Sequence, residues 1–298
     1  MSIDSEDRRP LHVFCGHHKC ATGWINGILR DLCYRMGWSH LIVNGEQDFR
    51  SQGTLSRYVQ SKGTDFLSYS NADLDHVSSL PRFRGFHVVR DPRDVVVSGY
   101  FSHRYSHPTE GWEELIPHRE RLNELSFEDG LLEEFKFSGA FLNLMDSWDY
   151  QQDHILEIKM ETLTADPEAG FKDIFRHLEL VHSEAGGEFG IRCISQWNVL
   201  MNRIRNRALI PWPAESLTIP RDRVSESDVG AVLARNNYSR KAGGRKKGEE
   251  NVRSHYRKGI HGDWKNHFNE LHIQTFKDMY NPLLLKLGYE ESEDWVSG

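Results

Sequence analysis

Residues 11–24 read Leu-His-Val-Phe-Cys-Gly-His-His-Lys-Cys-Ala-Thr-Gly-Trp, and this stretch decides the predicted fold. Residues 11–15 form a short apolar run that predicts a strand, and apolar residues at helical spacing follow from Trp24 onward. Strand, tight loop and helix therefore succeed one another, with Lys19 in the loop. Because the first-turn N–H groups of a helix lack partners and carry the positive end of its dipole, this loop predicts an anion site. A structural turn with a solvated lysine is the alternative interpretation.

The rest of the chain repeats this alternation. Further strands are predicted at residues 65–69, 85–89 and 155–160, and helices at residues 92–105, 127–151, 168–178, 227–236 and 269–287. Strands separated by helix-length segments indicate a parallel sheet. We expect an α/β fold, a single domain over residues 11–290 with a mostly parallel central sheet flanked by helices. Residues 1–10 are expected to form a flexible leader, residues 291–298 a C-terminal tail, and residues 210–223 and 239–253 long loops.

Composition limits the classes of partner. The 298 residues carry a net charge of −7, which would repel nucleic acid and anionic membranes, so an anionic ligand needs a local basic cluster. The four cysteines lack metal-binding spacing and are sparse for a disulfide framework, which favours reduced thiols. No apolar leader or membrane-length apolar run occurs in the sequence. We therefore expect a soluble cytoplasmic protein with no nucleic acid or membrane partner.

A second motif, Val-Val-Arg-Asp-Pro-Arg-Asp, covers residues 88–94. Arg90 comes at the end of a predicted strand, and Pro92 suits the first turn of a helix. Ser98 follows Arg90 by about two helical turns, close enough for a guanidinium and a hydroxyl to share one phosphate. An Arg/Asp salt-bridge cluster at a helix start is the alternative.

A third motif, residues 256–265, reads Tyr-Arg-Lys-Gly-Ile-His-Gly-Asp-Trp-Lys. Two basic residues precede glycines, which allow a backbone to approach a ligand closely. The segment predicts a flexible basic lid, with a solvated charged loop before the last helix as the alternative.

Together the three motifs resemble those of the PAPS-dependent sulfotransferases, where PAPS is 3′-phosphoadenosine 5′-phosphosulfate. The Lys19 loop is similar to the family's P-loop-like phosphosulfate-binding loop, residues 90–98 to its 3′-phosphate motif, and residues 257–265 to its C-terminal RKGxxGxWK motif. Residues 237–238 and 243–245 are similar to elements of bacterial members. The resemblance extends from the first predicted strand to the last predicted helix.

The resemblance implies a role for each matched residue. Lys19 would stabilise the leaving phosphate oxygen, while Trp24 and Tyr238 would stack on adenine. Arginine presents a planar fork to phosphate oxygens, which suits the expected 3′-phosphate contacts. No metal is expected, because positioning and charge stabilisation carry most of an in-line transfer between two oxygens. The residues expected to bind the cofactor are His18, Lys19, Cys20, Ala21, Thr22, Gly23, Trp24, Arg90, Ser98, Tyr238, Arg257, Lys258 and Gly259.

The loop departs from the family sequence Lys-Ser/Thr-Gly-Thr-Thr-Trp at three positions. Cys20, Ala21 and Gly23 replace the first hydroxyl residue, the glycine and the second threonine. Backbone contacts survive these changes, but Thr22 is left as the loop's one hydroxyl. We expect weaker cofactor binding than usual, or compensation by His17 or His18.

The general base is the least determined part of the site. Many cytosolic members place a histidine about twenty residues before the arginine equivalent to Arg90, where this chain has residues 68–70, Ser-Tyr-Ser. Glu46, with Asp48 beside it, matches the position of a catalytic glutamate in other sulfotransferases and is the first choice. His17 is the second choice. His18, His103 and His107 remain candidates, because imidazole transfers protons near neutral pH.

These observations predict a sulfotransferase that moves a sulfuryl group from PAPS to a hydroxyl or amine of a small-molecule acceptor and releases PAP. One alternative is an ATP-dependent small-molecule kinase, although the GxxxxGK[ST] pattern is absent. The other is a non-catalytic PAP-binding protein, suggested by the altered loop and the missing histidine. The sequence does not identify the acceptor, and a homodimer is compatible with it.

Overall fold

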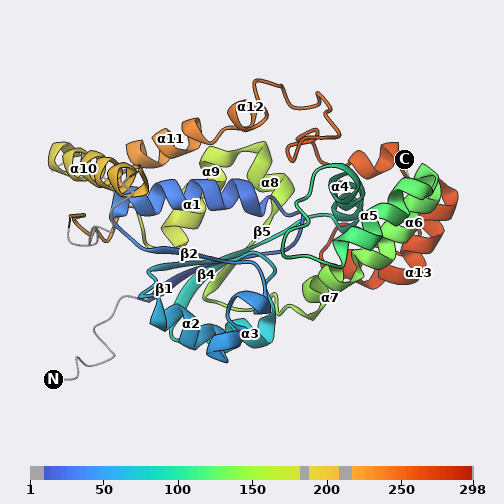
Figure 1. Cartoon of the computed structure of the whole chain (residues 1–298), viewed down its shortest axis with the longest axis horizontal. Coiled ribbons are helices and arrows are strands. Elements are labelled where there is room, and N and C mark those ends of the chain that lie inside the picture. Colours follow the sequence, from blue (N-terminus) through green and yellow to red (C-terminus); the bar gives the residue numbers. More distant parts are fainter. Residues whose placement is uncertain (1–9, 182–187, 208–216, 297–298) are drawn as a thin grey trace. The chain divides into compact units, whose positions relative to one another are not determined.

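The computed structural model describes residues 10–181, 188–207 and 217–296 (Figure 1). These residues divide into two compact units. The first unit comprises residues 10–16, 21–88 and 149–236, and the second comprises residues 17–20, 89–148 and 237–298 as far as they are described. Three of the boundaries fall inside the predicted anion-binding motifs, after Gly16, Cys20 and Val88, because Lys19 and Arg90 belong to the second unit. The predicted limits of the domain at residues 11 and 290 stay a prediction.

The first unit is built on a five-stranded sheet with the order β2-β3-β1-β4-β5. Its strands are β1 (Leu11–Gly16), β2 (His40–Val43), β3 (Phe66–Tyr69), β4 (Phe83–Val89) and β5 (Ile155–Lys159). β1 pairs in parallel with β3 and β4, and β2 pairs in parallel with β3. All six residues of β1 are buried, as expected for the centre of such a sheet. The predicted parallel sheet is therefore confirmed, and β2 is an edge strand absent from the sequence prediction.

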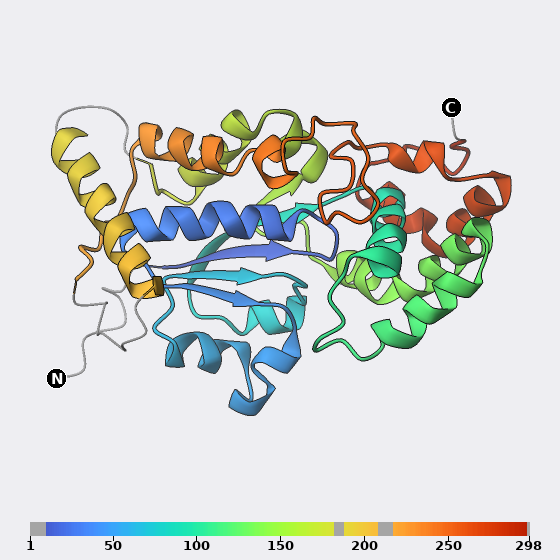
Figure 2. The same cartoon turned by 45° about the horizontal axis from the view of Figure 1, so that its top comes forward.

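Helices cover both faces of this sheet, as Figures 1 and 2 show. On one face lie α1 (Thr22–Met36), α8 (Met160–Ala165), α9 (Pro167–His177), α10 (Glu188–Arg207) and α11 (Glu226–Arg235). On the other face lie α2 (Leu55–Ser61) and α3 (Leu74–Ser78), after the short 3-10 turns η1 (Glu46–Asp48) and η2 (Arg50–Gln52). The buried face of α1 packs its leucines and isoleucines against phenylalanines from the sheet and from α9.

The second unit is helical. It contains α4 (Pro92–Tyr105), α5 (Leu115–Glu124), α6 (Phe127–Phe137), α7 (Gly139–Ser147), α12 (Tyr238–Lys241), the 3-10 turn η4 (Asp263–Asn266) and α13 (Glu270–Lys286). α4 packs against α5, α6 and α13. Its start follows the predicted signals, since Pro92 occupies the first turn and the Asp91 side chain caps the N–H of Arg93.

The single helix predicted over residues 127–151 is wrong. Ser138 ends α6 and precedes α7, so the segment forms two helices, and the extended backbone of Trp148 ends the second. The Ser138 hydroxyl is buried and donates a hydrogen bond to Glu134 at 2.5 Å, which provides a polar contact at the break. A hydrophobic pattern continues through this break, which explains the prediction.

The structure also bears on the expectations for the cysteines and for the two ends of the chain. All four cysteines are free. Trp295, within the stretch predicted as a tail, is buried, with the guanidinium of Arg93 over its ring and Trp264 edge-on to it. Residues 1–9 of the predicted leader, and residues 210–216 of the predicted loop, lie outside the described residues.

Among the helices that the structure describes, none has both the length and the hydrophobicity needed to cross a bilayer.

Candidate functional site

The Lys19 loop has an unusual backbone. Lys19 and Ala21 both adopt left-handed conformations, with φ of 63° and 59°. This region is disfavoured for residues with a Cβ atom. Ala21 is the N-cap position of α1, and that helix begins without a side-chain cap. The observed φ is one that glycine adopts without strain.

Lys19 itself carries an unpaired ammonium. Within the described ranges its Nζ makes no hydrogen bond or ion pair. Burial lowers the pKa of Lys19 to about 7, and the nearby charges of Arg90 and Arg257 act in the same direction. A cation held close to other cations is poised to bind an anion, which would restore its charge.

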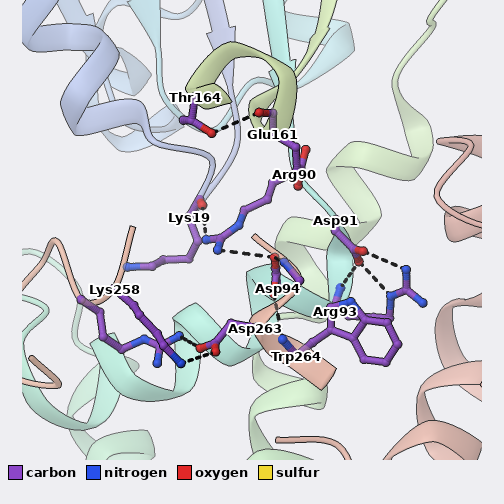
Figure 3. Close-up of polar contacts among 12 residues, drawn as sticks. Lys19, Arg90, Asp91, Arg93, Asp94, Glu161, Thr164, Lys258, Asp263 and Trp264 are labelled. Carbon is purple, nitrogen blue, oxygen red and sulfur yellow. Dashed lines mark hydrogen bonds and ion pairs between the residues drawn. The ribbon is translucent and has the colours of Figure 1, made fainter. Parts of the chain in front are cut away.

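Lys19, Arg90 and Arg257, together with Ser98, are called the cationic group below. Arg90 is its second member (Figure 3). Its Nη1 donates to the carbonyl oxygen of Lys19 at 3.2 Å, and its Nη2 lies 3.8 Å from Oδ2 of Asp94. The Nε of Arg90 is buried and, among the residues that can be described, has no hydrogen-bond partner. The Ser98 hydroxyl is half-buried and likewise makes no hydrogen bond to any described residue. Buried donors without partners are rare, so both atoms fit a site for phosphate oxygens.

Asp94 joins the second motif to the third. It is buried, and its carboxylate accepts hydrogen bonds from the backbone N–H groups of Gly262 at 2.7 Å and Trp264 at 3.0 Å. Figure 3 shows Asp94 between Arg90 and Trp264. The sequence analysis gave Asp94 no role. Its partners lie 168 and 170 residues away in the chain, which no local pattern reveals.

A buried carboxylate also holds the two basic residues of the third motif. Asp263 accepts from Arg257 and, at 2.6 Å, from Lys258, and Arg257 also pairs with Glu250. Burial alone would raise the pKa of Asp263, but hydrogen bonds from His267, Lys258 and Arg257 hold it well below its usual range. The guanidinium of Arg257 lies over the ring of Phe101 at 4.4 Å. Ion pairs therefore join the two basic residues of the predicted lid to Asp263 and Glu250.

Gly259 has a specific steric role. Its φ is +69°, and a Cβ built at this position would lie 2.3 Å from the ring of Tyr238. The absent side chain thus lets the Tyr238 ring lie against the backbone, and the Tyr238 hydroxyl donates to the carbonyl of Tyr256 at 3.4 Å. Arg245 ties the same loop together by donating to the carbonyl oxygens of Ala242, Glu249, Tyr256 and Arg257 and to the hydroxyl of Ser254.

The remaining predicted residues of the first unit lie at the start of α1 and in η1. Thr22 and Gly23 open α1. Trp24 is half-buried, donates through Nε1 to the carbonyl of Asn236 at 2.8 Å and meets the ring of Phe171 edge-on. The carboxylate of Glu46 is exposed and lies 3.6 Å from Arg50. No base role for Glu46 is tested by these contacts, and it stays a prediction.

The second unit also contains a group that the motifs do not show, which we call the histidine cluster: His18, His103, His118 and Glu134. Glu134 is fully buried and accepts from Nδ1 of His103 at 3.0 Å and from Nε2 of His118 at 2.8 Å. Nε2 of His103 lies 2.8 Å from Nε2 of His18. His103 was a candidate in the sequence analysis, but Glu134 and His118 were missed.

Aromatic rings surround this cluster. His18 stacks on Phe141 with ring centroids 4.4 Å apart and meets Trp112 edge-on at 5.5 Å. His17, the second predicted base, is buried and edge-on to Trp148 at 6.3 Å. Cys20 is buried beside them, with its thiol 3.6 Å from the carbonyl of His18.

His103, His118 and Glu134 are of residue types that bind metals, and their ligand atoms lie within 4.8 Å of one another. Here those atoms hydrogen bond directly to each other, and Glu134 has Ser138 as a third donor. The contacts therefore match a proton-bonded network, in which each short contact has one donor and one acceptor.

One family model matches the chain. Residues 76–189 match the model described as the sulfotransferase domain. This segment includes Arg90 and Ser98, so the resemblance stated from the sequence is confirmed over it. No curated protein matches the chain in sequence.

Among the solved structures that resemble the chain is mouse sulfotransferase SULT7A1 complexed with PAP. It has 15% identity and a TM-score of 0.47, and the match covers 95% of this chain and 88% of that one. Retinol dehydratase with androsterone and inactive cofactor PAP has 13% identity and a TM-score of 0.44, with 93% and 81% covered. Retinol dehydratase with retinol and PAP has 16% identity and a TM-score of 0.42, with 93% and 82% covered.

Proposed function

We propose that this chain, which carries a sulfotransferase domain match over residues 76–189, transfers a sulfuryl group from PAPS to a small-molecule acceptor and releases PAP. The acceptor atom is a hydroxyl oxygen or an amine nitrogen. The observation that carries the proposal is the cationic group of the second unit, in which Lys19, Arg90 and Ser98 all present donors without partners among the described residues.

The residues of this group fit a nucleotide that bears two separate anionic groups. The fixed charge of Arg90 and the hydroxyl of Ser98 bind the 3′-phosphate, together with Arg257. Arg257 is already oriented by Asp263 and Glu250, so its guanidinium is positioned before any ligand arrives. Lys258 shares Asp263 and supports the same phosphate.

Bound PAPS supplies a sulfuryl group attached to a phosphate leaving group. Lys19 stabilises the negative charge that develops on the leaving phosphate oxygen, as a preorganised cation does most effectively in a partly dry site. The pKa of Lys19 is lowered to about 7 without a ligand. The negative charge of bound PAPS raises this pKa, so the ammonium stays charged at neutral pH. Tyr238, held against Gly259, offers a flat ring for adenine, and Trp24 keeps the same predicted role. The chemistry proposed here uses no metal.

Calorimetric titration with PAP, run beside ATP and in EDTA, tests this proposal. Tight, metal-independent binding of PAP over ATP is expected. Preference for ATP with magnesium would overturn the proposal in favour of a kinase. A screen of hydroxyl and amine acceptors with sulfate-labelled PAPS then tests turnover, and PAP binding without sulfation of any acceptor class would favour the non-catalytic alternative.

A further inference from the structure

The hydrogen bonds of the histidine cluster fix the position of each proton. Glu134 is ionised at neutral pH. Hydrogen bonds from three donors, and the charge that His103 carries at low pH, outweigh burial and lower the pKa of Glu134 to about 2. An ionised carboxylate only accepts hydrogen bonds, so His103 carries its proton on Nδ1 and His118 on Nε2. Burial lowers the pKa of His103, which keeps that ring neutral. Its Nε2 is therefore a bare acceptor.

The same reasoning extends to His18. Its Nε2 lies 2.8 Å from Nε2 of His103, so the shared proton belongs to His18. A neutral His18 with a proton on Nε2 has a lone pair on Nδ1. No described residue forms a hydrogen bond to that nitrogen. His18 is half-buried and directly precedes Lys19, the residue with the unpaired ammonium.

We propose that His18 is the general base of this protein, accepting the acceptor's proton on Nδ1, and that His103 and Glu134 form a relay that positions it and disperses the positive charge. This inference rests on the proposed function. In the transfer step the acceptor oxygen forms its bond to sulfur while the bond from sulfur to the phosphate oxygen breaks. The acceptor's proton passes to Nδ1 of His18, and the proton on Nε2 of His18 moves to Nε2 of His103. The electron pair of the broken bond stays on the phosphate.

The geometry supports each link of this relay. The helices α4, α5 and α6, which carry His103, His118 and Glu134, pack against one another (Figure 1). Glu134 and His103 are both fully buried, so water does not compete for their hydrogen bonds. Arg119 donates to the carbonyl oxygens of His103 and His107, which holds the end of α4 in place. A relay of this kind raises the ability of a base to accept a proton, as a carboxylate behind an imidazole does.

Several titratable groups act on His18, and they favour a neutral ring. Burial lowers the pKa of His18, and His103, Lys19, His107 and His255 act in the same direction. These groups come from the Lys19 loop, from α4 and the segment after it, and from the loop before the third motif. A base must be uncharged before it acts, and this environment keeps His18 uncharged at neutral pH.

The position of the protons can be measured without any substrate. In nitrogen–proton NMR spectra of protein labelled selectively at its 16 histidines, variants His18→Ala and His103→Gln assign the two rings. At pH 7 we expect His18 neutral with its proton on Nε2 and His103 neutral with its proton on Nδ1. A His18 that is charged at pH 7, or that carries its proton on Nδ1, would overturn the relay.

Two variants separate the relay from simple packing. His103→Gln removes the partner of His18, so His18 should lose its single tautomer. His118→Gln is the matched control. Like His103, His118 is hydrogen-bonded to Glu134, at 2.8 Å, but it is not hydrogen-bonded to His18. The tautomer of His18 should therefore persist in this variant. Loss of the tautomer in both variants would show a packing effect and refute the relay.

Turnover gives the second readout, using an acceptor found in the screen. His103→Gln should lower kcat about 100-fold with the KM for PAPS unchanged. Glu46→Gln tests the base predicted from the sequence, and its kcat should fall less than that of His103→Gln. The opposite pattern, with Glu46→Gln inactive and His103→Gln active, would assign the base to Glu46 and refute the proposal. Activity that is lost in EDTA and restored by zinc would also refute the proposal. Failure of PAP binding overturns the proposed function, whereas the wrong tautomer refutes the relay even in a protein that binds PAP.

Discussion

Two neighbouring residues of one loop, His18 and Lys19, belong to groups with opposite electrostatic designs. Lys19 joins the cationic group, where Arg90 and Arg257 keep fixed positive charges and buried carboxylates hold them in place. His18 joins the histidine cluster, where His18 and His103 are kept neutral in a group with one buried carboxylate. The difference teaches how one loop serves two needs. Arg90 and Arg257 bind an anion with charge that is already present, whereas a proton is accepted only by a group that is still neutral.

The largest expected effect concerns the buried carboxylate that holds Arg257 of the cationic group in place. Asp263→Asn removes the charge that orients Arg257 and Lys258, and it should lower the free energy of unfolding by about 3 kcal/mol, as for a broken buried ion pair. Urea denaturation measures this loss. Glu250→Gln is the control, because Glu250 binds Arg257 from an exposed position and should contribute about 0.5 kcal/mol. Equal losses in the two variants would show that Asp263 is not the anchor.

The next effect concerns ligand binding by the same group. Arg257→Ala should weaken PAP binding by about 1.5 to 3 kcal/mol, the range for a hydrogen bond to a charged group. Calorimetry measures it, with Arg253→Ala as control because Arg253 is exposed on the same loop. Unchanged affinity in Arg257→Ala would remove this residue from the 3′-phosphate site.

A smaller effect separates the two groups by pH. Because the pKa of Lys19 is lowered to about 7 and an anion raises it, PAP binding should take up a proton above pH 7. Affinity should therefore fall as pH rises, by about fivefold between pH 7 and pH 8. His18 and His103 should add nothing in this range, because their pKa values are already lowered. Calorimetry in buffers of different ionisation enthalpy measures the uptake.

Lys19→Arg provides the control for that pH dependence, since arginine stays charged throughout. The fall in affinity between pH 7 and pH 8 should disappear in this variant. A persistent fall would assign the proton to another group.

The smallest effect concerns the backbone of the loop. Ala21→Gly relieves a left-handed conformation that costs about 1 to 2 kcal/mol for a residue with a Cβ atom, but adds the entropy of glycine. We expect a net gain of about 0.5 kcal/mol in urea denaturation. Ala231→Gly, in the exposed interior of α11, should instead destabilise by about 1 kcal/mol. Loss of stability in both variants would contradict strain at Ala21.

Most of the sheet could be predicted from the sequence, because its central strands are short buried apolar runs. The edge strand β2 has only four residues, and of these only Val43 is buried. α10 escaped prediction for a different reason. It buries the polar residues Ser195, Asn198 and Asn202 and exposes Trp197, Leu200 and Ile204, the reverse of the usual pattern.

The candidate site divides in the same way. The cations Lys19, Arg90 and Arg257 lie in contiguous motifs and were predicted. The carboxylates that orient them and the histidines were not all found, because each acts on partners from other elements. Glu134 is bonded to His103 from 31 residues away, and its neighbours in sequence show no motif. Single-sequence patterns identify residues that bind ligands through local loops, but not those that bind other side chains.

The contact between Gly259 and Tyr238 constrains how this chain can diverge. Since any side chain at position 259 would collide with the ring at position 238, position 259 cannot gain a side chain while that ring is present. Among descendants of a common ancestor, a larger residue at 259 should appear only where the aromatic ring at 238 has already been lost. The two positions should therefore be inherited as a pair.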